Sequence, residues 1–540
     1  MTAFADLVYR NGRVFCADAA RSWAEAIAIS EGRIVSVGGW AEVAATVGPS
    51  TEVIDLEGRF LCPGFQDAHV HPLTGGRTML SCDLSESRDG ASALEQIAAY
   101  AAAHPDETWM RGAGWRFPWF EGGMPSAALL DSVIPDRPAY FRVADGHAGW
   151  ANSAALVAAG IDAGTPEPRF GRIERLADGR PQGTLQEEGA MALVERILPR
   201  ESQEELEHAL EVAQNYLLSL GVTTWQDAWV TERLHLGYLH LAAEGRLRAT
   251  VRGALWWDPA SGIDQLDDFE VMRGEAVGRY RAGTVKLLLD GVCENFTART
   301  LTPYLDVSGT PTENFGMNYV DPGELPGIVT EVMRRGFQPH FHALGDAAVR
   351  SALDAVQAAR NTLGWSDVRP HLAHLQIVHP DDIPRFRRMG VTVNAQALWA
   401  CADSAMVDLT IPFLGEPRAS WQYPFGDLLR SGATLAMGSD WPVTTADPLA
   451  QIEVAVQRRE IGGDGSAFLP AQRIAVADAL VGFTAGSAYV NHRDGESGVV
   501  RPGAVADLVI LDGDPFEQVG LSSIRVHETV VDGRTVPRFS

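Results

Sequence analysis

Short runs of apolar residues near both ends of the chain predict a small β domain. Near the N-terminus such runs cover residues 7–10, 26–29 and 34–37, and turns at Asn11-Gly12 and Glu31-Gly32 follow the first two. Asn-Gly between alternating apolar residues favours a hairpin. Similar runs occur at 506–511 and 528–531. Each group alone is too small to bury a core, so we expect residues 1–62 and 490–540 to complete one β-sandwich domain.

Between these ends, apolar β-rich runs alternate with helical stretches such as 201–220 and 326–335. Seven runs are predicted as buried strands: 222–225, 250–255, 285–289, 337–342, 370–375, 391–395 and 434–437. The apolar run 59–62 before His69 makes eight. Eight strand-helix units that close on themselves form a TIM barrel, so we predict an α/β chain with a (β/α)8 barrel over residues 63–489.

The stretch between His71 and Gly221 is far longer than an ordinary step between barrel strands. We therefore predict an insertion after the first strand, over about residues 75–218, that forms a lid or substrate subdomain. It carries Trp109, Trp115, Trp119 and Trp150, four of the 14 tryptophans.

Composition limits the classes of function. With 46% hydrophobic and 21% charged residues the chain is globular, and its net charge of -26 disfavours nucleic acid and anionic membranes as partners. Neutral or cationic small molecules remain as substrates, and a homodimer is the expected assembly. Five widely spaced cysteines without a CxxC pair suggest neither disulfides nor a thiolate zinc site. Without a signal peptide or an apolar run of about 18 residues, the expected location is the cytoplasm.

Six polar residues at predicted strand ends are the candidates for a metal site. His69 and His71 are two positions apart, so on a strand both imidazoles point to one side and can bind one ion. Four further candidates lie in or directly after later apolar strands: Lys286, His342, His374 and Asp440. The catalytic residues of TIM barrels lie at the carboxyl ends of the strands.

Other interpretations of these residues remain open. His340 shares a strand face with His342 and can fill the barrel interior, and His371 fits a core position better than a ligand position. Lys286 can pair with Asp440 or Glu294, and Asp440 can cap a following helix.

The order His-x-His, Lys, His, His, Asp along these strands resembles the amidohydrolase superfamily of metal-dependent hydrolases. The segments 145–153, 221–224, 290–292, 342–346 and 438–443 are similar to its YtcJ-like (amidohydrolase 3) branch, which includes N-substituted formamide deformylases. The resemblance implies that His69, His71 and Asp440 hold one ion and that His342 and His374 hold a second. It also implies that Lys286 bridges them as a carboxylated lysine. Zinc is expected, one or two ions per chain, although the same ligands accept manganese, iron or cobalt.

The implied reaction is hydrolysis of an amide-type C–N bond, in an N-substituted formamide or a related amide or carbamate, with Asp440 moving the proton. Two alternatives remain: a non-hydrolytic isomerase or decarboxylase with the same ligands, and a mononuclear hydrolase with unmodified Lys286. In the insertion, His147 is the best candidate for contact with substrate, because Gly146 beside it permits close backbone approach. Further candidates for substrate binding are Trp115, Trp119, Trp150 and Glu294.

Overall fold

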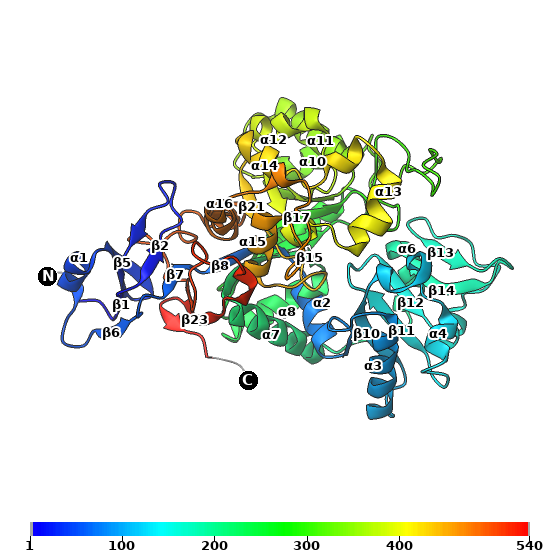
Figure 1. The fold of residues 1–540 in the computed structure, drawn as a ribbon, viewed down its shortest axis with the longest axis horizontal. Coiled ribbons are helices and arrows are strands. Elements are labelled where there is room, and N and C mark those ends of the chain that lie inside the picture. Colours follow the sequence, from blue (N-terminus) through cyan, green and yellow to red (C-terminus); the bar gives the residue numbers. More distant parts are fainter. Residues whose placement is uncertain (1–3, 538–540) are drawn as a thin grey trace.

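Eight parallel strands form the central sheet of the computed structural model, which describes residues 4–537 (Figure 1). In spatial order, which is also chain order, they are β8 (Phe65–Val70), β15 (Val222–Val230), β16 (Thr250–Trp256), β17 (Tyr280–Leu288), β18 (Gln338–Ala343), β19 (His371–His374), β20 (Thr392–Ala395) and β21 (Leu435–Met437). Each neighbouring pair is parallel. Seven of these strands lie where the sequence predicts them.

The sheet curls until its two edge strands meet. Just beyond β21, the backbone N–H of Asp440 donates to the carbonyl of His69 in β8 at 2.7 Å, and the N–H of His71 donates to the carbonyl of Trp441 at 2.9 Å. The sheet therefore fits a TIM-like barrel, and its carboxyl ends gather at one mouth.

The first barrel strand differs from the sequence prediction. The apolar run before His69 forms β7 (Phe60–Pro63), which pairs with β2 (Arg13–Phe15) and β22 (Leu508–Leu511) in another sheet. The barrel strand is β8, which contains His69, and all six of its residues are buried. Two strands follow each other here with only Gly64 between them, so the apolar pattern alone does not separate them.

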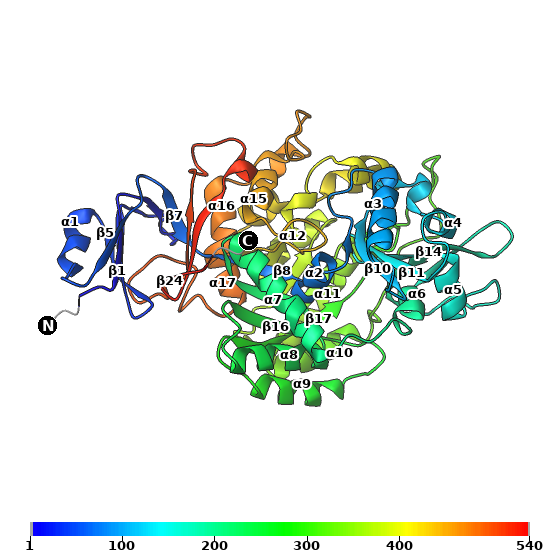
Figure 2. The same cartoon turned by 90° about the horizontal axis from the view of Figure 1, so that it is seen from below.

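Helices surround the barrel (Figure 2). The helix predicted at 201–220 is α7 (Gln203–Ser219), in which Ser202 and Glu205 form a reciprocal capping box. Its buried residues recur at helical spacing and pack into the barrel's main hydrophobic core. The other helices of this part are α2 (Pro72–Met79), α8 (Glu232–Ala243), α9 (Gln265–Gly274), α10 (Leu325–Arg334), α11 (Asp346–Leu363), α12 (Ile383–Met389), α13 (Ile411–Leu414), α14 (Phe425–Arg430), α15 (Pro448–Gln457), α16 (Val476–Val481) and α17 (Ser487–Val490).

Strands from both chain ends pair at the side of the barrel where the N-terminus lies (Figure 1). One sheet has the order β24 (Arg534–Thr535), β23 (Val526–Val531), β22, β7, β2, β3 (Trp23–Ala24), and the other has the order β5 (Arg33–Gly38), β4 (Ala26–Ser30), β1 (Leu7–Arg10), β6 (Glu52–Asp55), with α1 (Trp40–Val43) after β5. Residues of both sheets share one hydrophobic core.

The two predicted turns have different outcomes. The turn at Glu31-Gly32 joins β4 and β5, which pair antiparallel. The hairpin at Asn11-Gly12 is wrong, because β1 pairs with β4 and β6 whereas β2 pairs with β3 and β7. The chain crosses from one sheet to the other at this dipeptide, so packing overrides the local turn preference.

The segment after α2 forms a six-stranded sheet on the opposite side of the barrel (Figure 1). Its order is β13 (Arg172–Arg175), β14 (Pro181–Gln186), β12 (Ala148–Ala151), β11 (Ala139–Val143), β10 (Met110–Trp115), β9 (Cys82–Asp83), and its helices are α3 (Gly90–Ala103), α4 (Ala127–Asp131), α5 (Ser153–Ala159) and α6 (Glu187–Glu195). The exact division of the chain into domains stays a prediction.

Two further features concern the whole described chain. All five cysteines are free and buried. Within residues 4–537, the longest helices are too short or too polar to cross a lipid bilayer.

Candidate metal centre

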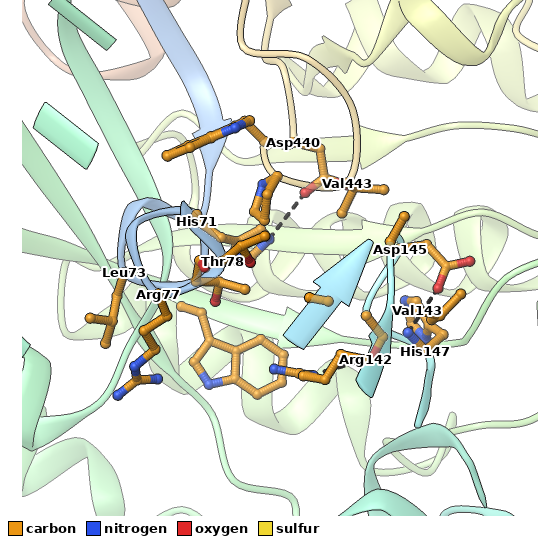
Figure 3. Close-up of a pocket in the computed structure, with 18 of the residues that line it drawn as sticks. His71, Leu73, Arg77, Thr78, Arg142, Val143, Asp145, His147, Asp440 and Val443 are labelled. Carbon is orange, nitrogen blue, oxygen red and sulfur yellow. Dashed lines mark hydrogen bonds and ion pairs between the residues drawn. The ribbon is translucent and has the colours of Figure 1, made fainter. Parts of the chain in front are cut away.

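All six predicted ligands line one cavity of about 600 Å³ at the mouth of the barrel. They are His69 in β8, His71 directly after it, Lys286 in β17, His342 in β18, His374 at the end of β19 and Asp440 after β21. Parallel strands present their carboxyl ends at one rim, so residues hundreds of positions apart meet there. Figure 3 shows His71 and Asp440 close to each other at this cavity.

The carboxylate of Asp440 is the centre of the cluster. Its Oδ1 lies 3.2 Å from Nε2 of His69 and 3.1 Å from Nε2 of His71, and its Oδ2 lies 3.9 Å from Nδ1 of His374. Ligands held about 2 Å from one ion stand about 3 Å from each other. The spacing of these atoms is therefore that of groups arranged around a common point.

Unpaired buried atoms provide an independent test of whether these residues fit a metal ion. Within residues 4–537, neither ring nitrogen of His374 has a hydrogen-bond partner, although the side chain is almost fully buried. Buried polar atoms without partners are costly. Ligand atoms of His69, His374 and Asp440 lie within 4.8 Å of one another. Two imidazoles and a carboxylate are a donor set that suits a divalent cation, so the residues fit the ion.

Two of these ligands have unusual backbone conformations. His374 has φ of 77° and Asp440 has φ of 57°, in the left-handed region that residues other than glycine rarely adopt. Such conformations persist where the surrounding structure holds them, and they cluster at functional sites. The next helix after Asp440 is α15, and it does not begin at Asp440. Its N-cap is Asp447, whose side chain accepts from the N–H of Leu449. The helix-cap interpretation of Asp440 is therefore wrong.

Lys286 is buried, with 2% of its surface exposed, and its Nζ lies 3.4 Å from Nε2 of His69. Among the described residues, no carboxylate oxygen lies within 4 Å of Nζ, so the structure contains no salt bridge from Lys286 to Asp440 or Glu294. Burial lowers the pKa of Lys286 to about 7. A substantial fraction of the amine is then unprotonated and nucleophilic at neutral pH.

His342 and His340 lie on the same strand but have different surroundings. The ring of His342 lies 4.4 Å from the ring of His374 and lines the cavity. His340 is fully buried below the cavity, where its Nε2 lies 2.8 Å from Nδ1 of His69. The ring of His371 packs at a tilt against that of His340 in the barrel interior, and His371 contacts Asn394. His371 therefore occupies a core position.

His147 reaches the cavity from the insertion, where Figure 3 places it beside Asp145 and Val143. Its Nδ1 lies 2.7 Å from the Glu187 carboxylate, and its ring lies 5.4 Å from the ring of His342. Burial lowers the pKa of His147, but the Glu187 carboxylate outweighs burial and the pKa rises to about 9. At neutral pH the imidazole is therefore a cation.

Glu187 was not predicted from the sequence. Besides His147, its carboxylate accepts hydrogen bonds from the hydroxyl of Tyr319 at 2.8 Å, the side-chain amide of Asn295 at 2.9 Å and the hydroxyl of Thr297 at 2.5 Å. The donors come from the loop after β17, far away in sequence. Glu187 stands at the junction of β14 and α6 in a polar stretch, so no periodicity distinguishes it from neighbouring Glu188.

Asp67 is a second residue that the sequence analysis missed. It is a buried acid within β8, and its carboxylate accepts from the N–H of His69 at 3.0 Å and from the N–H of Ser439 at 3.1 Å. It thereby ties the loop that carries Asp440 to the strand that carries His69. A carboxylate inside an apolar strand is the same kind of signal that identified Lys286.

The predicted tryptophans do not line the cavity. Trp115 and Trp150 are fully buried in the core of the insertion, where their indole N–H groups donate to the carbonyls of Phe141 and Ser126, and Trp119 packs on the same core. Their apolar area stabilises the insertion itself. Besides the histidines, the aromatic side chains that line the cavity are Trp229, Trp441, Tyr216 and Tyr319.

Glu294 is not among the residues that line the cavity, and the hydroxyl of Thr410 approaches its Oε1 at 3.4 Å. Burial raises the pKa of this carboxyl to about 7, and Asp145 adds to the effect. Direct contact of Glu294 with a substrate is therefore not supported by its position.

Comparison with known proteins adds the evolutionary context. A family model described as the amidohydrolase family matches residues 52–537. The chain is 31% identical to Protein LONG AFTER FAR-RED 3 of Arabidopsis thaliana, over 98% of this chain and 91% of the relative. It is 29% identical to N-substituted formamide deformylase of Arthrobacter pascens, over 99% of this chain and 98% of the relative.

A crystal structure of an uncharacterized metal-dependent hydrolase from Pyrococcus horikoshii has a similar fold. Its TM-score is 0.74 at 24% identity, covering 96% of this chain and 99% of that one.

Proposed function

The chain belongs to the amidohydrolase family, and on that premise we propose that it is a metal-dependent hydrolase that cleaves an amide-type C–N bond. The resemblance inferred from the sequence is confirmed by this match and by the similarity to a formamide deformylase. The observation that carries the proposal is the cluster of His69, His374 and Asp440: their ligand atoms lie within 4.8 Å of one another, and neither ring nitrogen of the buried His374 has a hydrogen-bond partner among residues 4–537.

Zinc is the proposed ion: His69, His71 and Asp440 would hold one ion, His342 and His374 a second, and Lys286 would lie between the two. A bound divalent cation supplies Lewis-acid polarisation of the scissile carbonyl and makes water a nucleophile at neutral pH. The lowered pKa of Lys286 supports its reaction with carbon dioxide, in which the free amine adds to the carbon and one proton is released. The resulting carbamate would carry one negative charge shared over two oxygens, and such oxygens are donors that suit divalent cations.

Asp440 is the proposed proton carrier. Its carboxylate takes the proton that the attacking water releases and passes it to the leaving nitrogen, so that the products are a carboxylic acid and an amine. The pKa of Asp440 is well below its usual range, because the neighbouring His69, His71 and His374 outweigh burial. The carboxylate is therefore in its basic form when substrate binds.

The residues of the cavity wall suggest where the N-substituent of a bound amide substrate would lie. Trp229, Trp441 and Tyr216 provide aromatic surface, whereas His147 provides a polar contact on the side of the insertion. An N-alkyl or N-aryl substituent fits the aromatic side, and the acyl oxygen fits the polar side. We therefore propose N-substituted formamides, or related amides and carbamates, as substrates.

A substrate panel tests the proposal. The metal-replete protein is incubated with N-alkyl and N-aryl formamides, acetamides and carbamates, and the released amine and acid are identified. We expect amine release from at least one class, and release at least about 10²-fold slower from the Asp440→Asn variant. If every compound is inert, the proposed substrate class is wrong. If the product has lost carbon dioxide or is an isomer, the enzyme is a decarboxylase or isomerase on the same scaffold.

A further inference from the structure

The imidazole of His340 contacts a metal ligand from below. His340 lies in the middle of β18, opposite Lys286 of β17 in the sheet register, and it is fully buried. Its Nε2 lies 2.8 Å from Nδ1 of His69, and the two rings meet edge to face at 75°. This contact is within hydrogen-bond distance, and it involves the ring nitrogen of His69 that faces away from the cavity.

The proton arrangement of this pair follows from the positions of its atoms. Nε2 of His69 faces Oδ1 of Asp440 at 3.2 Å and Nζ of Lys286 at 3.4 Å, so Nε2 is the atom directed at the ligand cluster. A ring nitrogen that binds a cation carries no proton, and a neutral imidazole then holds its proton on the other nitrogen. Nδ1–H of His69 must therefore donate, and Nε2 of His340 accepts.

We infer that His340 is a positioning residue that holds His69 in the Nδ1–H tautomer with Nε2 directed at the metal ion. The inference deepens the proposed metal-dependent function and rests on it. Metal-binding histidines generally donate their second N–H to a fixed acceptor, which sets the orientation and basicity of the ring. In this chain the acceptor for His69 is another imidazole.

The surroundings of His340 argue against simple filling of the core. Within the described residues its Nδ1 has no hydrogen-bond partner, although the side chain is fully buried. Burying an unpaired polar atom costs free energy that an apolar side chain of similar size avoids. An apolar side chain at this position could not accept the hydrogen bond from Nδ1–H of His69.

His371 provides a matched comparison in the same core. It is equally buried, and its ring lies against that of His340 with centroids 4.0 Å apart and the planes tilted by 42°. One ring nitrogen accepts from the amide of Asn394 at 3.2 Å, whereas the other has no partner in the described part of the chain. Because His371 contacts none of the proposed ligands, its replacement perturbs the core without removing the acceptor for His69.

The experiment measures zinc affinity of the metal-free full-length protein by competition with a chromophoric chelator. His340→Leu removes the acceptor, His340→Gln keeps a carbonyl oxygen that can accept, and His371→Leu is the control. We expect His340→Leu to weaken zinc binding by about 10- to 100-fold. His340→Gln should recover much of this loss, and His371→Leu should bind zinc like the wild type even where it lowers Tm.

The possible outcomes separate the inference from the proposed function. Wild-type affinity in His340→Leu, or an equal loss in His371→Leu, overturns the role of His340 while zinc binding by the wild type still supports a metal site. A wild type that binds neither zinc, manganese nor cobalt overturns both. Should His340→Leu fail to fold, His340→Met against His340→Gln makes the same comparison between side chains of similar length.

Discussion

Nδ1 of His147 donates a hydrogen bond to the carboxylate of Glu187 at 2.7 Å, and this contact connects the cavity to a buried part of the insertion. Glu187 also accepts from Tyr319, which lies beyond β17, so the same carboxylate connects the insertion to a barrel loop. Nε2 of His147 has no protein partner in the described chain. It is therefore the nitrogen available to a substrate.

The first prediction concerns the pH dependence of stability in Glu187→Gln. The folded pKa of His147 is about 9, above its ordinary value, so its stabilising effect is complete below pH 6.5 and is lost as the pH rises through 9. The His147 imidazolium and other donors outweigh burial and lower the pKa of Glu187 to about 2, so its effect is present above pH 4.5 and is lost toward pH 2.

The difference in unfolding free energy between wild type and Glu187→Gln should therefore be largest between about pH 4.5 and 6.5 and should shrink toward about pH 9. Urea unfolding at several pH values measures it. Tyr319→Phe removes a different donor from the same carboxylate and should leave this pH dependence in place. A difference that stays constant from pH 5 to 10 would contradict the proposed ion pair.

The second prediction concerns Asp440→Asn. The change is nearly isosteric, and asparagine tolerates the left-handed backbone at this position. The amide cannot carry the proton, so kcat should fall by about 10²- to 10⁴-fold while the circular dichroism spectrum is unchanged. Steady-state kinetics on whichever amide the wild type hydrolyses provides the measurement. Turnover at the wild-type rate would remove Asp440 from the mechanism.

The third prediction concerns metal removal and Lys286. Chelation should abolish activity, and zinc should restore it fully only when bicarbonate is present, because the amine of Lys286 needs carbon dioxide to form a carbamate. Metal analysis should then give about two ions per chain, and about one in buffer depleted of carbon dioxide. Lys286→Arg serves as the control that cannot be carboxylated. Equal stoichiometry with and without bicarbonate would favour the mononuclear alternative.

The fourth prediction compares two tryptophans. Trp229 lines the cavity and stacks on Trp256 with ring centroids 3.5 Å apart, whereas Trp115 is buried in the core of the insertion. Trp229→Ala should raise KM for N-aryl substrates more than for N-methyl ones. Trp115→Ala should cost about 3–5 kcal/mol of stability and leave KM unchanged. A raised KM in Trp115→Ala, with KM unchanged in Trp229→Ala, would instead support a role of Trp115 in substrate binding.

The sequence determined the type of fold and most of the candidate metal centre. Period and length of the apolar runs located seven of the barrel strands, because buried parallel strands are apolar on both faces. His69, His71, Lys286, His342, His374 and Asp440 could be found because a charged or imidazole side chain at the end of such a strand departs from that pattern.

Only the tertiary structure decided the contacts that depend on packing between distant segments. The apolar pattern did not separate β7 from β8, since both are buried and only Gly64 lies between them. A tryptophan in the insertion gives the same sequence signal whether its side chain faces a core or a cavity. Glu187 and His340 acquire their roles from partners brought near by folding, 40 and 271 positions away along the chain. Local sequence encodes which residues are buried, whereas their partners follow from how the strands and loops assemble.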